Sequence, residues 1–195
     1  MNDDGFYLIG IGSSAGGLEP LQTIVRGLSA DINAALIIVQ HIPVDYASNL
    51  DQILQRLTPL KLIPVETIEY VEPGNIYVMR VGKQMVLKDH FLSIEERQTD
   101  EPTNRTIDRC FESIAKEAGA KAIGVILSGA GFDGLEGAKA IEDRKGLVIV
   151  QDPITADFPL MPQNLIANDH PDHVLSPEDI QKKINNYVLG HKNAT

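Results

Sequence analysis

IGIGSSAGG, residues 9–17, is the stretch on which the arrangement of this chain depends. The short apolar run at 6–9 is typical of a buried strand, and an apolar helical pattern begins at Leu18. Four glycines, at positions 10, 12, 16 and 17, crowd the segment between them. We therefore expect the strand to end among these glycines, in a turn whose backbone N–H groups and helix dipole face whatever lies above.

The same stretch fits two functional motifs. Residues 10–15 fit the dinucleotide fingerprint GxGxxG/A, and residues 12–16 fit GxSxG, the turn that exposes a nucleophilic serine, here Ser14. The fingerprint also requires an acidic residue at the end of the second strand, where it binds the ribose. That predicted strand ends in Val39-Gln40-His41, and none of these residues is acidic. The sequence therefore favours the serine motif over the dinucleotide motif.

The composition predicts a single globular domain. The chain has 195 residues, 43% of them hydrophobic, and a formal net charge of −10, which argues against nucleic-acid binding and against docking on an anionic membrane. No apolar run approaches the roughly 20 residues of a membrane span, and the first residues lack a basic signal-peptide region. The single cysteine, Cys110, suits a reducing compartment and is expected to be buried. We therefore predict a cytoplasmic protein without membrane insertion or a nucleic-acid partner.

Buried strands and amphipathic helices alternate along most of the chain. Near-continuous apolar runs at 35–39, 122–127 and 147–150 suit parallel strands covered on both faces. Residues 68–96 instead contain short runs separated by turn residues, which are typical of antiparallel hairpins. The sequence thus predicts a doubly wound α/β fold, with a mostly parallel sheet, helices on both faces and an antiparallel hairpin region.

Three side chains with complementary chemistry follow three of the predicted strands. Ser14 follows the first strand, His41 the second, and Asp133 the strand at 122–127. Because a parallel sheet binds ligands at the carboxyl ends of its strands, we expect these side chains to converge. Acyl transfer needs this set: Ser14 attacks a carbonyl, His41 takes its proton, and Asp133 orients the imidazole.

Backbone N–H groups at Ala15 and Ala130 are the candidates for binding the oxyanion of such a reaction. Each of the three side chains also has a structural interpretation, with Ser14 or Asp133 capping the helix that follows and His41 a surface or core histidine. The order Ser-His-Asp, with the serine after the first strand, differs from the order in α/β-hydrolases.

No cofactor and no metal site is predicted. His170 and His173 stand three residues apart and could contribute to one, but Pro171 places them in a loop. No further ligands are evident nearby.

Three motifs together resemble the catalytic domain of CheB-type chemotaxis methylesterases, and the resemblance covers nearly the whole chain. They are GSSAGG at 12–17, QHIP at 40–43, where the proline stops the strand, and LSGAGFDG at 127–134. Weaker matches lie at 73–77, at 105–108 and at 161–162. The resemblance implies one catalytic domain over residues 1–195, with a polar tail from about 190. It also implies a serine hydrolase that removes methyl esters from glutamate side chains of chemoreceptors, releasing methanol, and that deamidates particular glutamines.

Carried over from the family, Ser14 is the nucleophile, His41 the base and Asp133 its partner. Ala130 stands where the family usually has methionine, and the receiver domain that normally precedes the esterase domain is missing. The implied partners are methylated chemoreceptor helices, together with a methyltransferase or receiver domain in the same or another chain. Two alternatives remain open: a non-catalytic binding module of the same fold, and a nucleotide-binding domain.

Overall fold

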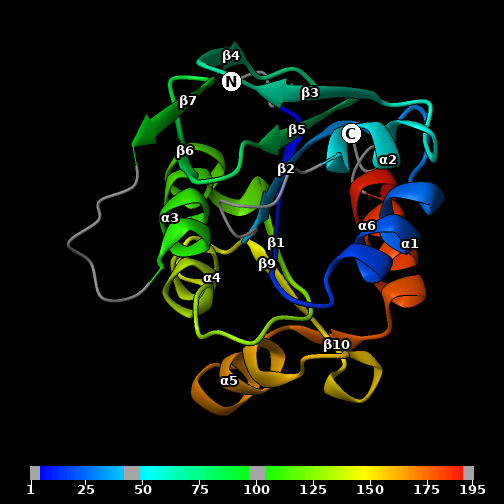
Figure 1. The fold of residues 1–195 in the computed structure, drawn as a ribbon, viewed down its shortest axis with the longest axis vertical. Coiled ribbons are helices and arrows are strands. Elements are labelled where there is room, and N and C mark those ends of the chain that lie inside the picture. Colours follow the sequence, from blue (N-terminus) through cyan, green and yellow to red (C-terminus); the bar gives the residue numbers. More distant parts are fainter. Residues whose placement is uncertain (1–4, 42–48, 97–103, 191–195) are drawn as a thin grey trace.

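The computed structural model describes residues 5–41, 49–96 and 104–190. Seven parallel strands form the main sheet, in the order β10-β9-β8-β1-β2-β5-β3 (Figure 1). They are β1 (Tyr7–Ser13), β2 (Ala34–Gln40), β3 (Lys61–Val65), β5 (Asn75–Met79), β8 (Ala122–Ile126), β9 (Leu147–Gln151) and β10 (His173–Leu175). A small antiparallel sheet, in the order β4-β7-β6, contains β4 (Ile68–Tyr70), β6 (Lys83–Lys88) and β7 (Phe91–Glu96).

Helices cover both faces of the main sheet, as the sequence predicts. On one face pack α1 (Leu18–Gly27), α2 (Leu50–Gln55) and α6 (Pro177–Gly190). The other face is covered by α3 (Thr106–Ala118), α4 (Leu135–Glu142), α5 (Leu160–Asn168) and the small sheet. Two short 3₁₀ helices, η1 (Gly119–Lys121) and η2 (Pro153–Thr155), complete the secondary structure of the described residues. The doubly wound α/β prediction is confirmed.

β1 is longer than the sequence predicts, because the first two glycines belong to the strand. A Cβ atom at Gly10 would lie 2.6 Å from Cε1 of Phe111, and one at Gly12 would lie 2.6 Å from Cγ2 of Ile107. Their expected place in the turn is therefore wrong. These glycines let α3 approach the sheet closely, whereas the turn itself contains Gly16, whose φ of +70° favours glycine.

The hairpin prediction for residues 68–96 is correct for β4, β6 and β7 and wrong for β5. That strand lies between β2 and β3 in the main sheet and runs parallel to both. All four residues at 76–79 are buried, so this segment needs cover on both faces as well as a strand on each edge. The small antiparallel sheet could not give this strand cover on both faces.

The order of the strands reverses at β1, which pairs with β2 on one edge and with β8 on the other. The segments that follow these three strands therefore meet at the centre of the carboxyl edge. Cys110 is fully buried in α3, as predicted. Pro43 and the tail at 191–195 lie outside the described residues. In the described part of the chain, no helix has the length and apolar character needed to span a bilayer.

Candidate active site

Ser14 follows β1 directly, at the centre of the carboxyl edge. Its N–H donates to the carbonyl of Ser128 at 3.0 Å, and its carbonyl accepts from the N–H of Gly17 at 3.0 Å. A Cβ atom at Gly129 would lie 3.1 Å from Cβ of Ser14, so the loop after β8 lies against the serine. The helix cap is Gly17, without a side-chain cap, and the capping interpretation of Ser14 is therefore wrong.

His41 lies beside the serine turn and contacts the predicted aspartate. Its backbone N–H donates to the carbonyl of Ser13 at 2.9 Å. Its ring Nε2 lies 2.9 Å from Oδ2 of Asp133, and the two side chains are 15% and 2% exposed. Within the described residues the Ser14 hydroxyl makes no hydrogen bond. The structure thus joins two of the three predicted side chains and places the turn that carries the third beside them.

Asp133 accepts four hydrogen bonds. Its Oδ1 accepts from the backbone N–H groups of Asp108 and Gly134, both at 2.9 Å. Its Oδ2 accepts from the N–H of Ile107 at 2.7 Å and faces His41. Four donors suit an ionised carboxylate, which can only accept. As a cap, Asp133 binds the first turn of α3, and the expectation that it caps the helix after it is wrong.

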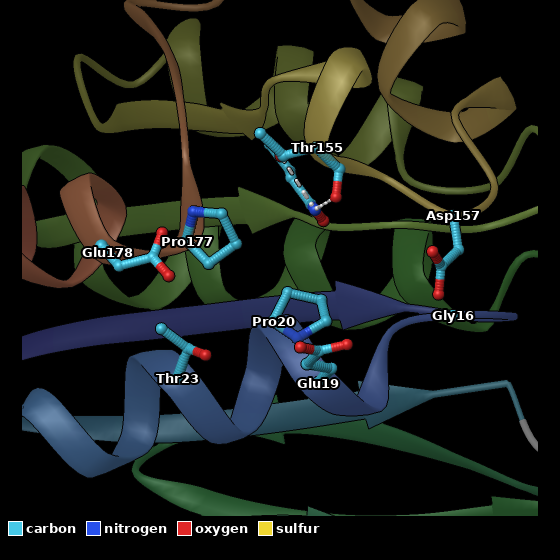
Figure 2. A pocket seen from close by; sticks show the side chains of 9 residues that line it. Gly16, Glu19, Pro20, Thr23, Thr155, Asp157, Pro177 and Glu178 are labelled. Atoms are coloured by element: carbon cyan, nitrogen blue, oxygen red, sulfur yellow. Dashed lines mark hydrogen bonds between the residues drawn. The ribbon is translucent and has the colours of Figure 1, made fainter.

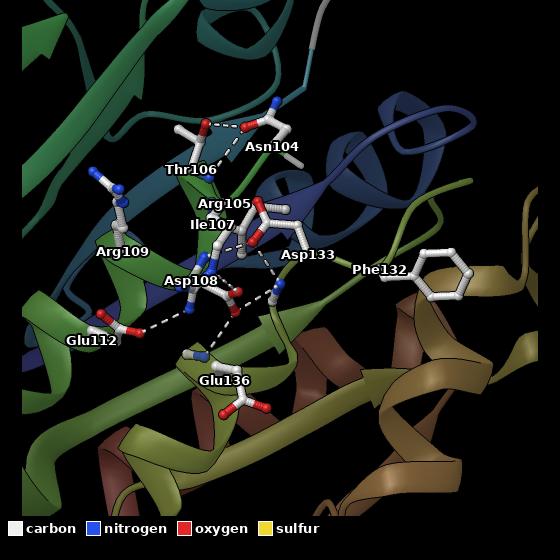
Figure 3. A network of polar contacts seen from close by, with 12 residues as sticks. Asn104, Arg105, Thr106, Ile107, Asp108, Arg109, Glu112, Phe132, Asp133 and Glu136 are labelled. Atoms are coloured by element: carbon white, nitrogen blue, oxygen red, sulfur yellow. Dashed lines mark hydrogen bonds and ion pairs between the residues drawn. The ribbon is translucent and has the colours of Figure 1, made fainter. Parts of the chain in front are cut away.

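Asp108, in the first turn of α3, is a buried polar residue that the sequence reasoning did not single out (Figure 3). Its Oδ1 accepts from the N–H groups of Gly134 and Gly137 at 3.0 and 2.9 Å. Its Oδ2 lies 3.3 Å from Nε of Arg105. Burial, and secondly the charge of Asp133, raise the pKa of Asp108 to about 6. The available signal was its place in the weak family match at 105–108.

The two predicted oxyanion donors lie in loops on either side of Ser14. Within the described residues, neither Ala15 nor Ala130 uses its N–H in a hydrogen bond. Ser128, at the start of the loop that contains Ala130, binds the loop of Ala15. Its Oγ donates to the Ala15 carbonyl at 2.9 Å and accepts from the Phe158 N–H at 3.0 Å. Its own N–H donates to Oε1 of Gln151 at 2.9 Å. These contacts fix the backbone on which both donors lie.

A hollow of about 280 Å³ opens beside His41. Its walls combine apolar surface with the guanidinium of Arg105 and an aromatic ring, and Phe132 is 65% exposed with its ring directed away from the polar network (Figure 3). The lining residues are His41, Asn104, Arg105, Asp108, Gly131, Phe132 and Asp133. The hollow can hold a side chain next to the imidazole.

A second hollow, of about 260 Å³, is lined by Gly16 of the serine turn and by residues at the start of α1 (Figure 2). The carboxylates of Glu19, Asp157 and Glu178 line it, and no lysine, arginine or histidine is among its lining residues. Such a surface repels a pyrophosphate. The acidic lining of this hollow argues against the dinucleotide interpretation. So do the side chains of α3 that fill the space beside Gly10 and Gly12. Within the described ranges, no group of three or more His, Cys, Asp or Glu side chains could hold a metal ion.

Comparison with known proteins gives consistent matches. The family model for CheB methylesterase matches residues 9–184. A Leptospira interrogans protein is 36% identical over 176 residues, which are 90% of this chain and 91% of that protein. The protein-glutamate methylesterase/protein-glutamine glutaminase of Moorella thermoacetica is 32% identical over 191 residues; the match covers 95% of this chain and 45% of that protein. The crystal structure of the Thermotoga maritima CheB methylesterase catalytic domain matches with a TM-score of 0.87 and 26% identity, covering 94% of this chain and 100% of that chain.

Proposed function

This chain belongs to the CheB methylesterase family, and we propose that it is a serine hydrolase acting on methyl esters of glutamate side chains in chemoreceptors. The observation that carries the proposal is the hydrogen bond between His41 and Asp133 beside the Ser14 turn. Curated relatives carry both the methylesterase and the glutaminase name. The proposal therefore includes hydrolysis of glutamine side-chain amides, which passes through the same acyl intermediate.

In the proposed reaction, Oγ of Ser14 attacks the ester carbonyl and its proton passes to Nδ1 of His41, the ring nitrogen that does not face Asp133. The tetrahedral intermediate places its oxyanion near the N–H groups of Ala15 and Ala130. His41 then returns the proton to the leaving methoxide, and methanol departs. A water molecule, deprotonated by His41, attacks the glutamyl-serine ester and releases the glutamate and Ser14.

Asp133 holds the imidazole in one orientation and stabilises the imidazolium that forms in both half-reactions. Its own position is well determined, because backbone N–H groups from two segments bind its oxygens. Ala130, which stands where the family usually has methionine, still has the backbone N–H that the mechanism uses. Together with the enzyme names of the relatives, this favours a hydrolase over the binding-module alternative.

The proposed partners are methylated chemoreceptor helices, whose glutamyl esters would enter the hollow beside His41. A methyltransferase or a receiver domain, in the same or another chain, is a further proposed partner, since the chain spans about half the length of the Moorella relative. The cytoplasm is the proposed location, supported by the single, fully buried cysteine.

The test is methanol release from a methylated receptor cytoplasmic fragment, compared between the parent chain, Ser14→Ala and Ser13→Ala. We expect Ser14→Ala to lower kcat by at least about 10³-fold, as loss of a nucleophile does in serine hydrolases. Ser13 is the matched control: its hydroxyl is buried and has no partner in the described chain, so its loss should leave activity unchanged. Release that survives Ser14→Ala would refute the mechanism.

A further inference from the structure

Asp108 caps a helix to which it does not belong. It lies in the first turn of α3, and its Oδ1 accepts the N–H groups of Gly134 and Gly137 at the start of α4. Gly134 is the N-cap residue of α4 and provides no side-chain cap of its own. A helix start leaves its first N–H groups without intrahelical partners, and the Asp108 carboxylate supplies the acceptor here.

Asp133 does the same in the opposite direction. It precedes α4, and its carboxylate accepts the N–H groups of Ile107 and Asp108 in the first turn of α3. The N-cap residue of α3, Arg105, likewise makes no side-chain cap. The two helices thus exchange caps through two aspartates (Figure 3). Their starts pack tightly, since a Cβ atom at Gly137 would lie 3.0 Å from Cα of Asp108.

We propose that Asp108 is a positioning residue of this site: by capping α4, it fixes the turn from which Asp133 presents Oδ2 to His41. The inference rests on the proposed function for its effect on catalysis, but the geometry itself is independent of it. If the Asp108 cap is lost, the N–H of Gly137 loses its acceptor and that of Gly134 keeps only Oδ1 of Asp133. The turn that carries Asp133 is then free to shift relative to His41, and small displacements of a catalytic group are costly in rate.

The charge of the Asp108 carboxylate should also affect the rate. Asp108 is faced by Asp133, by Arg105, which also binds Glu112, and by Lys139 on α4. His41, the partner of Asp133, lines the same hollow as Asp108. Burial and the neighbouring carboxylate raise the pKa of Asp108 to about 6, against the opposing contributions of Gly137 and Arg105. Above that pH, Asp108 adds a negative charge near the imidazolium that forms during the reaction. Its protonation should therefore lower the rate.

The experiment compares Asp108→Asn, Asp108→Ala and a control, Asp179→Asn, in the full chain. Asparagine keeps an oxygen for the α4 cap and removes the charge, whereas alanine removes both. Asp179 also lies in the first turn of a helix, α6, and is exposed, paired with Lys182. Three quantities are measured: kcat and KM for methanol release, the pH profile of kcat/KM, and the low-field ¹H NMR signal of the proton between His41 and Asp133.

We expect Asp108→Ala to lower kcat by about 10- to 100-fold with KM changed less than about threefold, and to shift or broaden the low-field signal. Asp108→Asn should keep the signal but lose part of the activity above pH 7, because it lacks the Asp108 charge at every pH. It should also lose the step that the parent profile shows near pH 6. The Asp179→Asn control should match the parent in all three measurements.

An active parent, with Asp108→Ala unchanged in kcat and in the NMR signal, would overturn the inference. If Asp108→Ala does not fold, Asp108→Glu decides, because it keeps the charge but displaces the carboxylate from the start of α4: a kcat and an NMR signal identical to those of the parent would overturn the inference. If instead the parent releases no methanol and is not labelled by a fluorophosphonate, the proposed function fails. The NMR comparison of Asp108→Ala with the parent then still tests the positioning role.

Discussion

Gly12→Ala is the substitution that best tests how the glycine stretch acts. The new Cβ atom would lie 2.6 Å from Cγ2 of Ile107 and 3.1 Å from Cδ1 of Ile126. Both side chains are buried in the core and have little room to move. Overpacking of this kind lowers the free energy of unfolding by about 1–3 kcal/mol. The reduced backbone entropy of the unfolded alanine chain returns about 0.4–1 kcal/mol.

At the middle of each range the net loss is about 1 kcal/mol, which corresponds to a fall in Tm of about 2–4 °C for a chain of this size. Activity should fall as well, because Ile107 donates its N–H to Asp133 at 2.7 Å. A displaced Ile107 moves the carboxylate that holds His41, and we expect kcat to fall by about tenfold or more.

Gly10→Ala provides the comparison, because its Cβ atom would meet the ring of Phe111, one turn further along α3. The loss of stability should be similar, but kcat should stay within about threefold of the parent where the protein is folded. Gly190→Ala is the control: among the described residues, apart from its own helix backbone and chain neighbours, no atom lies within 4 Å of its Cβ position, so Tm should not fall.

The assays are thermal unfolding followed by circular dichroism and methanol release at a temperature where all variants are folded. A Tm for Gly12→Ala within 1 °C of the parent value, at roughly the precision of such a scan, would refute the packing role of this glycine. Equal loss of kcat in Gly10→Ala and Gly12→Ala would refute the connection through Ile107 to Asp133.

Three further predictions concern single side chains. Ser128→Ala leaves the Ala15 carbonyl and the Phe158 N–H without their partner, so the free energy of unfolding should fall by about 1–3 kcal/mol and kcat should fall with it; denaturant unfolding and methanol release measure both. Burial raises the pKa of Cys110 to about 12, so Ellman's reagent should not react with the folded protein at pH 8 and should titrate one thiol in guanidinium chloride. The pKa of Asp108 is raised from 3.8 to about 6, so the folded state binds its proton more tightly than the unfolded state does, and this residue's contribution to stability falls as pH rises between those values. Thermal unfolding from pH 4 to 7 should therefore show Asp108→Asn gaining stability relative to the parent, and a difference independent of pH would contradict the raised pKa.

The sequence by itself determined which strand ends lie side by side at the carboxyl edge. The apolar runs ending near Ser14, His41 and Asp133 are long enough to be read as buried strands, and parallel strands bring such ends to one edge. The catalytic roles of Ser14, His41 and Asp133 and the oxyanion roles of Ala15 and Ala130 stay predictions. So does the extent of the domain over 1–195.

Only the tertiary structure decided how the glycines and the hairpin region are used. Gly10 and Gly12 read as a turn because local sequence does not show that α3, about 100 residues further on, packs against them. β5 read as part of a hairpin because a short apolar run does not state which sheet will cover it.

The exchange of caps between Asp108 and Asp133 is also decided by the tertiary structure. The two residues are 25 positions apart, and neither caps the helix that its own position suggests. Periodicity and capping rules describe contacts within one or two turns of the chain. A carboxylate that binds the start of another helix becomes visible only when α3 and α4 are packed side by side, and in this protein that packing holds the aspartate facing His41.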